Sequence, residues 1–332
     1  MDYYNKEIIS NIELLGRLNK KFNSPLIDRS RTIKQNINII SEMPTLTTEL
    51  KFADITDARA VELLEKASKN QKNICVSYSG GIDSTTALVS LLKHKNDYQD
   101  VQIITVMSDD SYYEYPEFYE NHLKSETTVE WVEPLEVMSR LSADREKSCY
   151  IVTGEIGDQL FGSQIMFNVG AHKMSIPWGT FLSVPDFMLL KDIAEKNPFF
   201  VEDKSYGNFL WWINFTLKYQ WVQLRMYAQL ETVAFKDIIH FFDTEDYQKW
   251  AISNPMQVKF PDYNLPQTYK LPAKEYIFSF CKDLWYLKSK KKVPSLYKTV
   301  EGGMSSGLSR ITEDFKLYKF MDVEYEVNQK AG

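Results

Sequence analysis

The sequence predicts an α/β fold, a doubly wound parallel sheet followed by a mainly helical C-terminal lobe. Between residues 55 and 165, short apolar and β-branched runs alternate with amphipathic segments, as in βαβ units. A glycine turn joins the first apolar run to the segment after it. From about Phe167 the alternation fades and long aromatic runs compatible with helices take over, which predicts the second lobe.

The predicted elements begin with a helix, because Ala58, Val61 and Leu64 recur at helical spacing and Asp57 is a candidate N-cap. The elements after it are predicted as a strand at 73–79, a helix at 85–95, a second strand at 101–110, a helix at 115–124, a third strand at 127–134 and a fourth at 149–155. This alternation is typical of a parallel sheet.

The length of 332 residues allows two lobes, although one large α/β domain is also compatible with it. We interpret residues 1–54 as an N-terminal appendage, 55–165 as the α/β core and 166–332 as the helical lobe with a basic segment near its end.

Composition and charge exclude several function classes. A net charge of −6 argues against broad binding of a phosphate backbone, so nucleic acid is not an expected partner. Cys75, Cys149 and Cys281 are far apart and the chain has four His, so we expect neither structural zinc nor a disulfide framework. The sequence has no apolar run long enough for a membrane span or a signal peptide, which favours a cytoplasmic protein without a membrane partner.

The most informative segment is Ser79–Ser84, with the sequence SGGIDS between a predicted strand and a predicted helix. Two glycines let the backbone turn sharply and approach a ligand, and a helix N-terminus favours an anion. Ser79 and Ser84 can donate to phosphate oxygens, and Asp83 can hold Mg²⁺. A plain connection between strand and helix is the alternative. The loop is not a Walker A motif, because no Lys follows the glycines.

A second motif, YIVTGEIGDQLFGS at 150–163, places Gly154, Glu155 and Asp158 directly after the fourth predicted strand. Ligands of doubly wound sheets bind beyond the carboxyl ends of the strands, so we expect these residues near the glycine loop. An acidic turn that caps a helix is the alternative. Near the C-terminus, residues 288–292 contain four lysines, and such a run is usually a solvated face.

The SGGxDS pattern resembles the PP-loop ATP pyrophosphatase superfamily, whose members have the adenine nucleotide alpha hydrolase-like fold and release pyrophosphate from ATP. The second motif is similar to GEGADELFGG of asparagine synthetase and β-lactam synthetase, although Gln159 and Ser163 depart from it. The resemblance implies ATP and Mg²⁺ and an AMP- and pyrophosphate-forming ligase. Such an enzyme adenylates a carboxylate or amide oxygen and transfers the acyl group to ammonia or an amine.

The resemblance also implies roles for single residues. Asp83 and Asp158 would bind Mg²⁺, and Glu155 would orient the amine or its substrate. In the basic segment, Lys290 would stabilise the transition state and Lys288 would take the arginine position of an R-x-K pattern. The residues implied at the nucleotide are Ser79, Gly80, Gly81, Asp83, Ser84 and Gly154 at the phosphates, and Val76, Tyr78, Val106 and Met107 beside the adenosine.

The expected partners are a small-molecule carboxylate and an amine or ammonia. Asp2 stands where glutamine-dependent relatives have a catalytic Cys, and only residues 1–78 precede the loop, so no glutaminase domain is expected. This leaves open a separate ammonia-supplying partner, an amine on the substrate itself, and a homo-oligomer. Two other functions remain: modification of an RNA base or a deazaguanine, and a nucleotide-binding subunit without catalysis.

Overall fold

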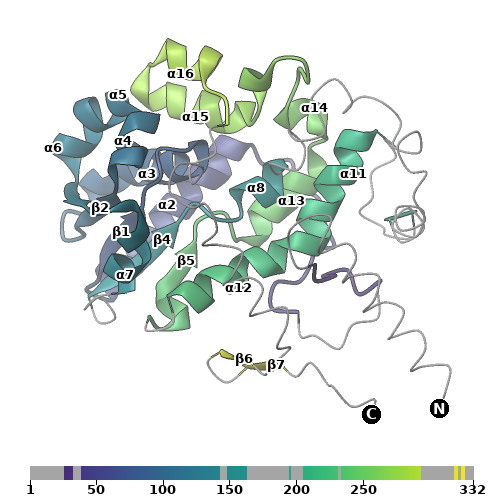
Figure 1. The fold of residues 1–332 in the computed structure, drawn as a ribbon, viewed down its shortest axis with the longest axis horizontal. Helices are drawn as coiled ribbons and strands as arrows, with labels where there is room; N and C mark the ends of the chain where they lie inside the picture. Colours follow the sequence, from purple (N-terminus) through teal and green to yellow (C-terminus); the bar gives the residue numbers. More distant parts are fainter. Residues whose placement is uncertain are drawn as a thin grey trace. The chain divides into compact units, whose positions relative to one another are not determined.

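A computed structural model describes residues 26–32, 39–142, 148–162, 194–195, 205–230, 233–292, 318–320 and 323–325 (Figure 1). The chain divides into two compact units, which are Met1–Thr45, Gly162–Leu224 and Val300–Gly332 for unit 1, and Leu46–Phe161 and Arg225–Thr299 for unit 2. Residues 225–299, which the sequence analysis assigned to a C-terminal lobe, therefore belong to the unit that contains the sheet.

Unit 2 is an α/β structure built on a five-stranded parallel sheet with the order β3-β2-β1-β4-β5. Its strands are β1 (Asn73–Ser77), β2 (Ile103–Met107), β3 (Thr128–Trp131), β4 (Cys149–Thr153) and β5 (Ile238–His240). The residues of the central strands β1 and β4 are almost all buried, which is typical of a parallel sheet covered on both faces. At the edge, β3 is partly exposed and carries polar residues.

The predicted parallel α/β arrangement is confirmed, and one strand was missed. Ile238–His240 fall in the lobe predicted to be mainly helical, but these residues form β5 and pair with Ile151–Thr153 of β4. All three residues of β5 are buried. Three residues give no periodicity, so burial against β4 and not local pattern decides their conformation.

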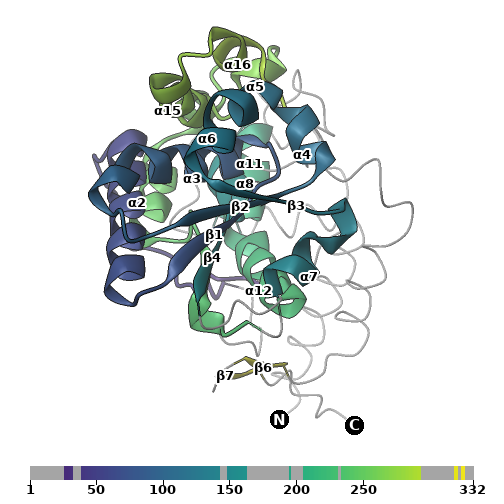
Figure 2. The same cartoon turned by 90° about the vertical axis from the view of Figure 1, so that its left-hand side faces the viewer.

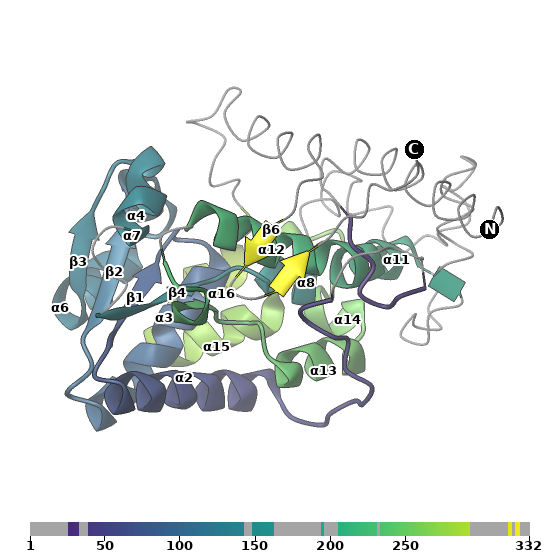
Figure 3. The same cartoon turned by 90° about the horizontal axis from the view of Figure 1, so that it is seen from below.

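Helices cover both faces of the sheet. The helices α2 (Phe52–Lys69), α3 (Ile82–His94) and α15 (Leu271–Cys281) pack against one another. Figure 2 shows α2 and α3 on one face of the sheet and α7 (Val137–Ser142) on the other, and Figure 3 shows α15 beside α3. Because α15 rests on α3, the chain beyond residue 225 is brought to the end of β1.

Shorter elements connect these parts of unit 2. They are η1 (Lys95–Asp97), α4 (Asp109–Glu114), α5 (Pro116–Phe118), the π-helix η2 (Tyr119–Leu123), α6 (Lys124–Glu126), η3 (Pro134–Glu136), α8 (Gly157–Phe161), η7 (Phe235–Asp237), α13 (Glu245–Ser253), α14 (Met256–Lys259), η8 (Pro266–Thr268) and α16 (Leu284–Ser289). None of the described helices is both long enough and apolar enough to cross a bilayer.

The described part of unit 1 includes helical segments, α11 (Tyr206–Trp212) and the π-helix η6 (Ile213–Lys218), followed by α12 (Tyr219–Gln229), which runs past the end of the unit. Two short strands, β6 (Tyr318–Phe320) and β7 (Val323–Tyr325), pair antiparallel.

The N-terminal segment of unit 1 is hydrogen-bonded to the π-helix. The backbone N–H of Ile27 donates to the carbonyl of Leu217 at 2.6 Å, and the Arg29 guanidinium donates to the carbonyl of Phe215 at 2.7 Å. A π-helix shifts the internal hydrogen bonds by one residue, and here its carbonyls accept from a distant segment. Part of the predicted N-terminal appendage is therefore built into unit 1.

Candidate active site

The candidate site lies where the strand order changes direction. In the sheet, β2 and β3 lie on one side of β1, and β4 lies on the other. Ser77 at the end of β1 is in register with Thr153 at the end of β4. In α/β sheets, ligands bind beyond the carboxyl ends of the strands at such a reversal of strand order. Both sequence motifs begin at this point, one after each strand.

The glycine loop after β1 requires glycine at position 80. Gly80 has a φ of 74°, and a Cβ there would lie 2.4 Å from the carbonyl oxygen of Ser111 and 2.7 Å from the Cβ of Glu114. Ser84 holds the loop from the inside, because its hydroxyl accepts from the backbone N–H of Ser79 at 3.2 Å. The loop is thereby fixed against α4 and against the first turn of α3.

The outer side of the glycine loop carries polar groups. Gly81 is the N-cap of α3 and offers no side chain to the first amide groups of the helix. Ser79 is exposed, and its hydroxyl lies 3.1 Å from that of Ser84. Exposed hydroxyls and amide groups at the N-terminus of a helix are suited to an anion.

The turn after β4 packs directly on this loop. A Cβ at Gly154 would lie 2.7 Å from the backbone nitrogen of Ser84, and a Cβ at Gly157 would lie 2.4 Å from the carboxyl carbon of Asp83. Between the two glycines, Ile156 is buried with a φ of 75°, a left-handed conformation that is rare for a β-branched residue. Such strain, typically about 1–3 kcal/mol, persists only where the surroundings enforce it.

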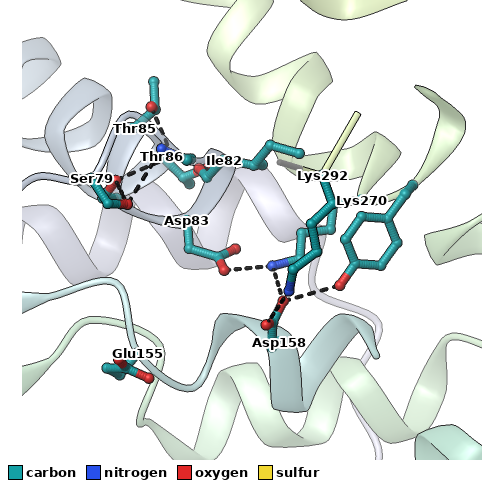
Figure 4. A network of polar contacts seen from close by, with 12 residues as sticks. Ser79, Ile82, Asp83, Thr85, Thr86, Glu155, Asp158, Lys270 and Lys292 are labelled. Carbon is teal, nitrogen blue, oxygen red and sulfur yellow. Dashed lines mark hydrogen bonds and ion pairs between the residues drawn. The ribbon is translucent and has the colours of Figure 1, made fainter. Parts of the chain in front are cut away.

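Two aspartates and two lysines meet above these turns, and we call them the aspartate cluster (Figure 4). Lys270 Nζ lies 2.5 Å from Asp83 Oδ2 and 2.7 Å from Asp158 Oδ1. Lys292 Nζ lies 2.5 Å from the other oxygen, Asp158 Oδ2. The Tyr269 hydroxyl donates to Asp158 Oδ1 at 3.1 Å. The two aspartates, which lie 75 positions apart by their numbers, therefore share one ammonium group.

The two aspartates differ in their pKa. Burial raises the pKa of Asp83; Lys270 opposes this effect, and the negative charge of Asp158 adds to it. Burial also acts on Asp158, but the ammonium groups of Lys270 and Lys292 outweigh it and hold the pKa of Asp158 well below its usual value. Asp83 Oδ1 is buried and has no hydrogen-bond partner among the described residues. An acceptor of this kind is satisfied by a donor or a cation that arrives from outside.

Lys270 was not singled out in the sequence. Its side chain is 3% exposed, and its backbone is left-handed, with φ 55° and ψ 39°. Its pKa is raised, because the carboxylates of Asp158 and Asp83 outweigh the effect of burial. In the sequence it stands alone between Tyr269 and Leu271, so no pattern marked it; only the packing of α15 on α3 brings it to the site.

A second ion pair lies against the glycine loop, and we call it the Glu114 pair. Lys290 Nζ lies 2.9 Å from Glu114 Oε1, and the two side chains are 3% and 6% exposed. A Cβ at Gly81 would lie 3.7 Å from the same Glu114 oxygen, so the pair is next to the loop. Lys274 donates to the backbone carbonyl of Lys290 at 3.2 Å. The side chain and the backbone of Lys290 are thus each held by a separate residue.

Burial shifts all three of these groups toward neutrality. It lowers the pKa of Lys290 and raises that of Glu114, while the attraction between the two opposes both shifts. Burial lowers the pKa of Lys274 to about 8.

Other residues singled out in the sequence lie away from the aspartate cluster. Glu155 lies apart from it in Figure 4, and its carboxylate forms an ion pair with Arg225 at 2.7 Å. Lys288 is exposed on α16 and takes part in no ion pair with a described residue. The side chains expected beside the adenosine are buried, and they are Val76, Tyr78, Val106 and Met107. Because these four side chains are buried, contact with a ligand at these positions would be made by backbone atoms.

The two aspartates fit a magnesium ion in donor type and number. Mg²⁺ is usually bound through one or two carboxylates, with water and substrate phosphates as its other ligands. Within the described ranges, no group of three or more His, Cys, Asp or Glu side chains is placed to hold a metal by itself. An ion at Asp83 and Asp158 would therefore depend on ligands from a substrate.

Comparison of the sequence with models of known protein families gives no match, and comparison with curated proteins gives no significant match. A function for this chain is therefore inferred from the geometry of the site and from the two motifs.

Proposed function

We propose that this chain is an ATP-dependent carbon–nitrogen ligase of the PP-loop type, similar to the synthetase part of asparagine synthetase. It adenylates a carboxylate or an amide oxygen of a small molecule, releases pyrophosphate, and transfers the acyl group to ammonia or an amine. The observation that carries the proposal is the meeting of Asp83 and Asp158 at one ammonium group, beside a glycine loop at the point where the strand order reverses. The finer fold assignment, adenine nucleotide alpha hydrolase-like, is part of the proposal.

The glycine loop is suited to the phosphates of ATP. Ser79 is exposed, Gly81 carries no side chain, and no side chain caps the N-terminus of the 13-residue helix α3. These groups bind and orient an anion without a further cation. Ser84 supports the loop from below, because its hydroxyl is engaged with Ser79 and with the carbonyl of Gly81.

Asp83 and Asp158 are the proposed ligands of Mg²⁺, which, when bound, would neutralise charge on the phosphates. Asp83 Oδ1, buried and without a partner among the described residues, supports this assignment. Gly157 supports it too, because only a residue without a side chain leaves room for the Asp83 carboxylate.

Lys290 is the proposed electrostatic catalyst. Its ammonium group is buried beside the loop and is held by Glu114, so its position is fixed before a substrate arrives. A preorganised charge in a site shielded from water stabilises developing negative charge more than a mobile surface lysine does. Lys288 is not part of this proposal, since it is exposed.

The test is product analysis with the full-length protein, ATP, Mg²⁺ and a metabolite extract, with mass spectrometry for AMP, pyrophosphate and a new amide. We expect all three products from the wild type and on the order of a thousandfold less AMP from Asp83→Asn. AMP together with a modified RNA base or a modified deazaguanine would indicate the second candidate function. Nucleotide binding without any pyrophosphate would indicate a binding subunit and would contradict the proposal.

A further inference from the structure

Lys270 holds the oxygen atoms that a cation would need. Its Nζ contacts Asp83 Oδ2 and Asp158 Oδ1, at 2.5 Å and 2.7 Å. An ion that bridged the two carboxylates would compete with the ammonium group for these same oxygens. The other oxygen of Asp158 is occupied by Lys292, and the other oxygen of Asp83 is buried.

The charges of the aspartate cluster already balance. Two carboxylates face two ammonium groups, so a divalent ion that entered alone would leave two uncompensated positive charges. It would also separate Lys270, which is 3% exposed, from its partners, and a buried charge without its partner is strongly unfavourable. A polyphosphate changes this balance, because it brings negative charge and offers oxygen acceptors to the displaced ammonium group.

The position of Lys270 is built into the fold. Its left-handed backbone, with a φ of 55°, immediately precedes α15, and the hydroxyl of the neighbouring Tyr269 donates to Asp158. A residue other than glycine keeps this backbone conformation only where its surroundings hold it. Lys292 differs, because it is 22% exposed and its ion pair among the described residues is with Asp158 alone.

We infer that Lys270 is an internal counter-ion that keeps a free divalent cation away from Asp83 and Asp158, so that the cation enters together with a polyphosphate. This inference rests on the proposed function, because it concerns the same site. Lys270 is a positioning residue in this scheme, and it creates positive coupling between the binding of the cation and of the polyphosphate. The coupling is lost when the ammonium group is removed.

The test measures Mn²⁺ binding by the full-length protein with electron paramagnetic resonance, with and without tripolyphosphate. Association of Mn²⁺ with tripolyphosphate in solution is measured separately and subtracted. We expect Lys270→Met to bind Mn²⁺ alone about tenfold more tightly than the wild type, as for a typical coupling between sites. In the wild type, tripolyphosphate should tighten Mn²⁺ binding about tenfold, and in Lys270→Met by much less.

Two variants serve as matched controls. Lys291→Met removes an exposed charge next to the site and should leave Mn²⁺ affinity unchanged. Lys292→Met removes an ammonium group that pairs with a single carboxylate in the described part of the chain, and it should increase the affinity less than Lys270→Met does. An equal gain from Lys292→Met would overturn the specific role of Lys270, because the effect would then follow from charge alone.

Two further results would overturn the inference. One is a Lys270→Met protein that binds Mn²⁺ no more tightly than the wild type. The other is a wild type that binds Mn²⁺ alone as tightly as with tripolyphosphate, and this result needs no variant to fold. Failure of the proposed function is separate: no AMP from the wild type would contradict the ligase, whereas AMP with unchanged Mn²⁺ affinity in Lys270→Met would remove only the role of Lys270.

Discussion

The aspartate cluster and the Glu114 pair are both built from lysines and carboxylates, yet they differ in how the charges are shared. In the Glu114 pair, one lysine faces one carboxylate at 2.9 Å, and both side chains are almost fully buried. In the aspartate cluster, Lys270 is divided between two carboxylates, and these are 21% and 30% exposed. Both groups lie in unit 2.

The difference indicates two physical roles. A closed pair with a single partner on each side loses a partner only at high cost, so it holds Lys290 in place. An ammonium group that is shared by two partly exposed carboxylates can exchange its partners, because an incoming ion or phosphate supplies new ones. Changes to the aspartate cluster should therefore affect ligand binding and turnover, and changes to the Glu114 pair should affect stability as well.

The largest effect is expected from Asp83→Asn. The amide keeps the size of the side chain above Gly157 but removes the charge and one acceptor, so AMP formation should fall on the order of a thousandfold while the protein stays folded. AMP release and thermal unfolding measure the two properties. Turnover equal to that of the wild type would reject Asp83 as a cation ligand.

The Glu114 pair is tested by a double-mutant cycle in urea. Glu114→Gln and Lys290→Met should each lower the free energy of unfolding by about 3–5 kcal/mol, because each leaves a buried partner unsatisfied. The double variant should lose much less than the sum of the two. Additive losses would mean that the residues do not stabilise each other. Lys291→Ala, at an exposed position, is the control and should change the free energy of unfolding by less than about 0.5 kcal/mol.

Substitutions at two glycines test whether the two regions have different roles in turnover and in stability. In Gly157→Ala the new methyl group meets the carboxylate of Asp83, which can rotate away, so turnover should fall about tenfold with little loss of stability. In Gly80→Ala the methyl group meets the backbone of Ser111 at a φ of 74°, so the free energy of unfolding should fall by about 1–3 kcal/mol. Turnover and urea unfolding of both variants measure this. The opposite pattern would contradict the division of roles.

The smallest effect concerns the support of Lys290 by Lys274. Burial lowers the pKa of Lys274 to about 8 in the folded protein, below its value in the unfolded chain. The unfolded chain then binds more protons between the two pKa values, so this residue makes the free energy of unfolding rise as the pH increases through about 8 to about 10.4. Lys274→Met should remove that rise. Parallel pH curves for the variant and the wild type would contradict it.

Part of this architecture could be predicted from the sequence and part could not. The parallel α/β arrangement followed from the alternation of apolar and amphipathic runs, and the closeness of Asp83 to Asp158 followed from the rule that strand ends gather at one edge. Lys270 could not be predicted, because its approach depends on the packing of α15 against α3. Within residues 288–292, spacing alone could not tell the buried Lys290 from the exposed Lys288.

The hydrogen bonds between the N-terminal segment and the π-helix η6 constrain the time course of folding during synthesis. Arg29 donates to Phe215, 186 positions further along the chain. Translation proceeds from the N-terminus at about 5–20 residues per second, so the arginine leaves the ribosome roughly ten seconds or more before its acceptor exists. Over that interval the N-terminal segment cannot form these bonds. Because unit 1 also includes Val300–Gly332, it completes only after all five strands of the sheet have been made.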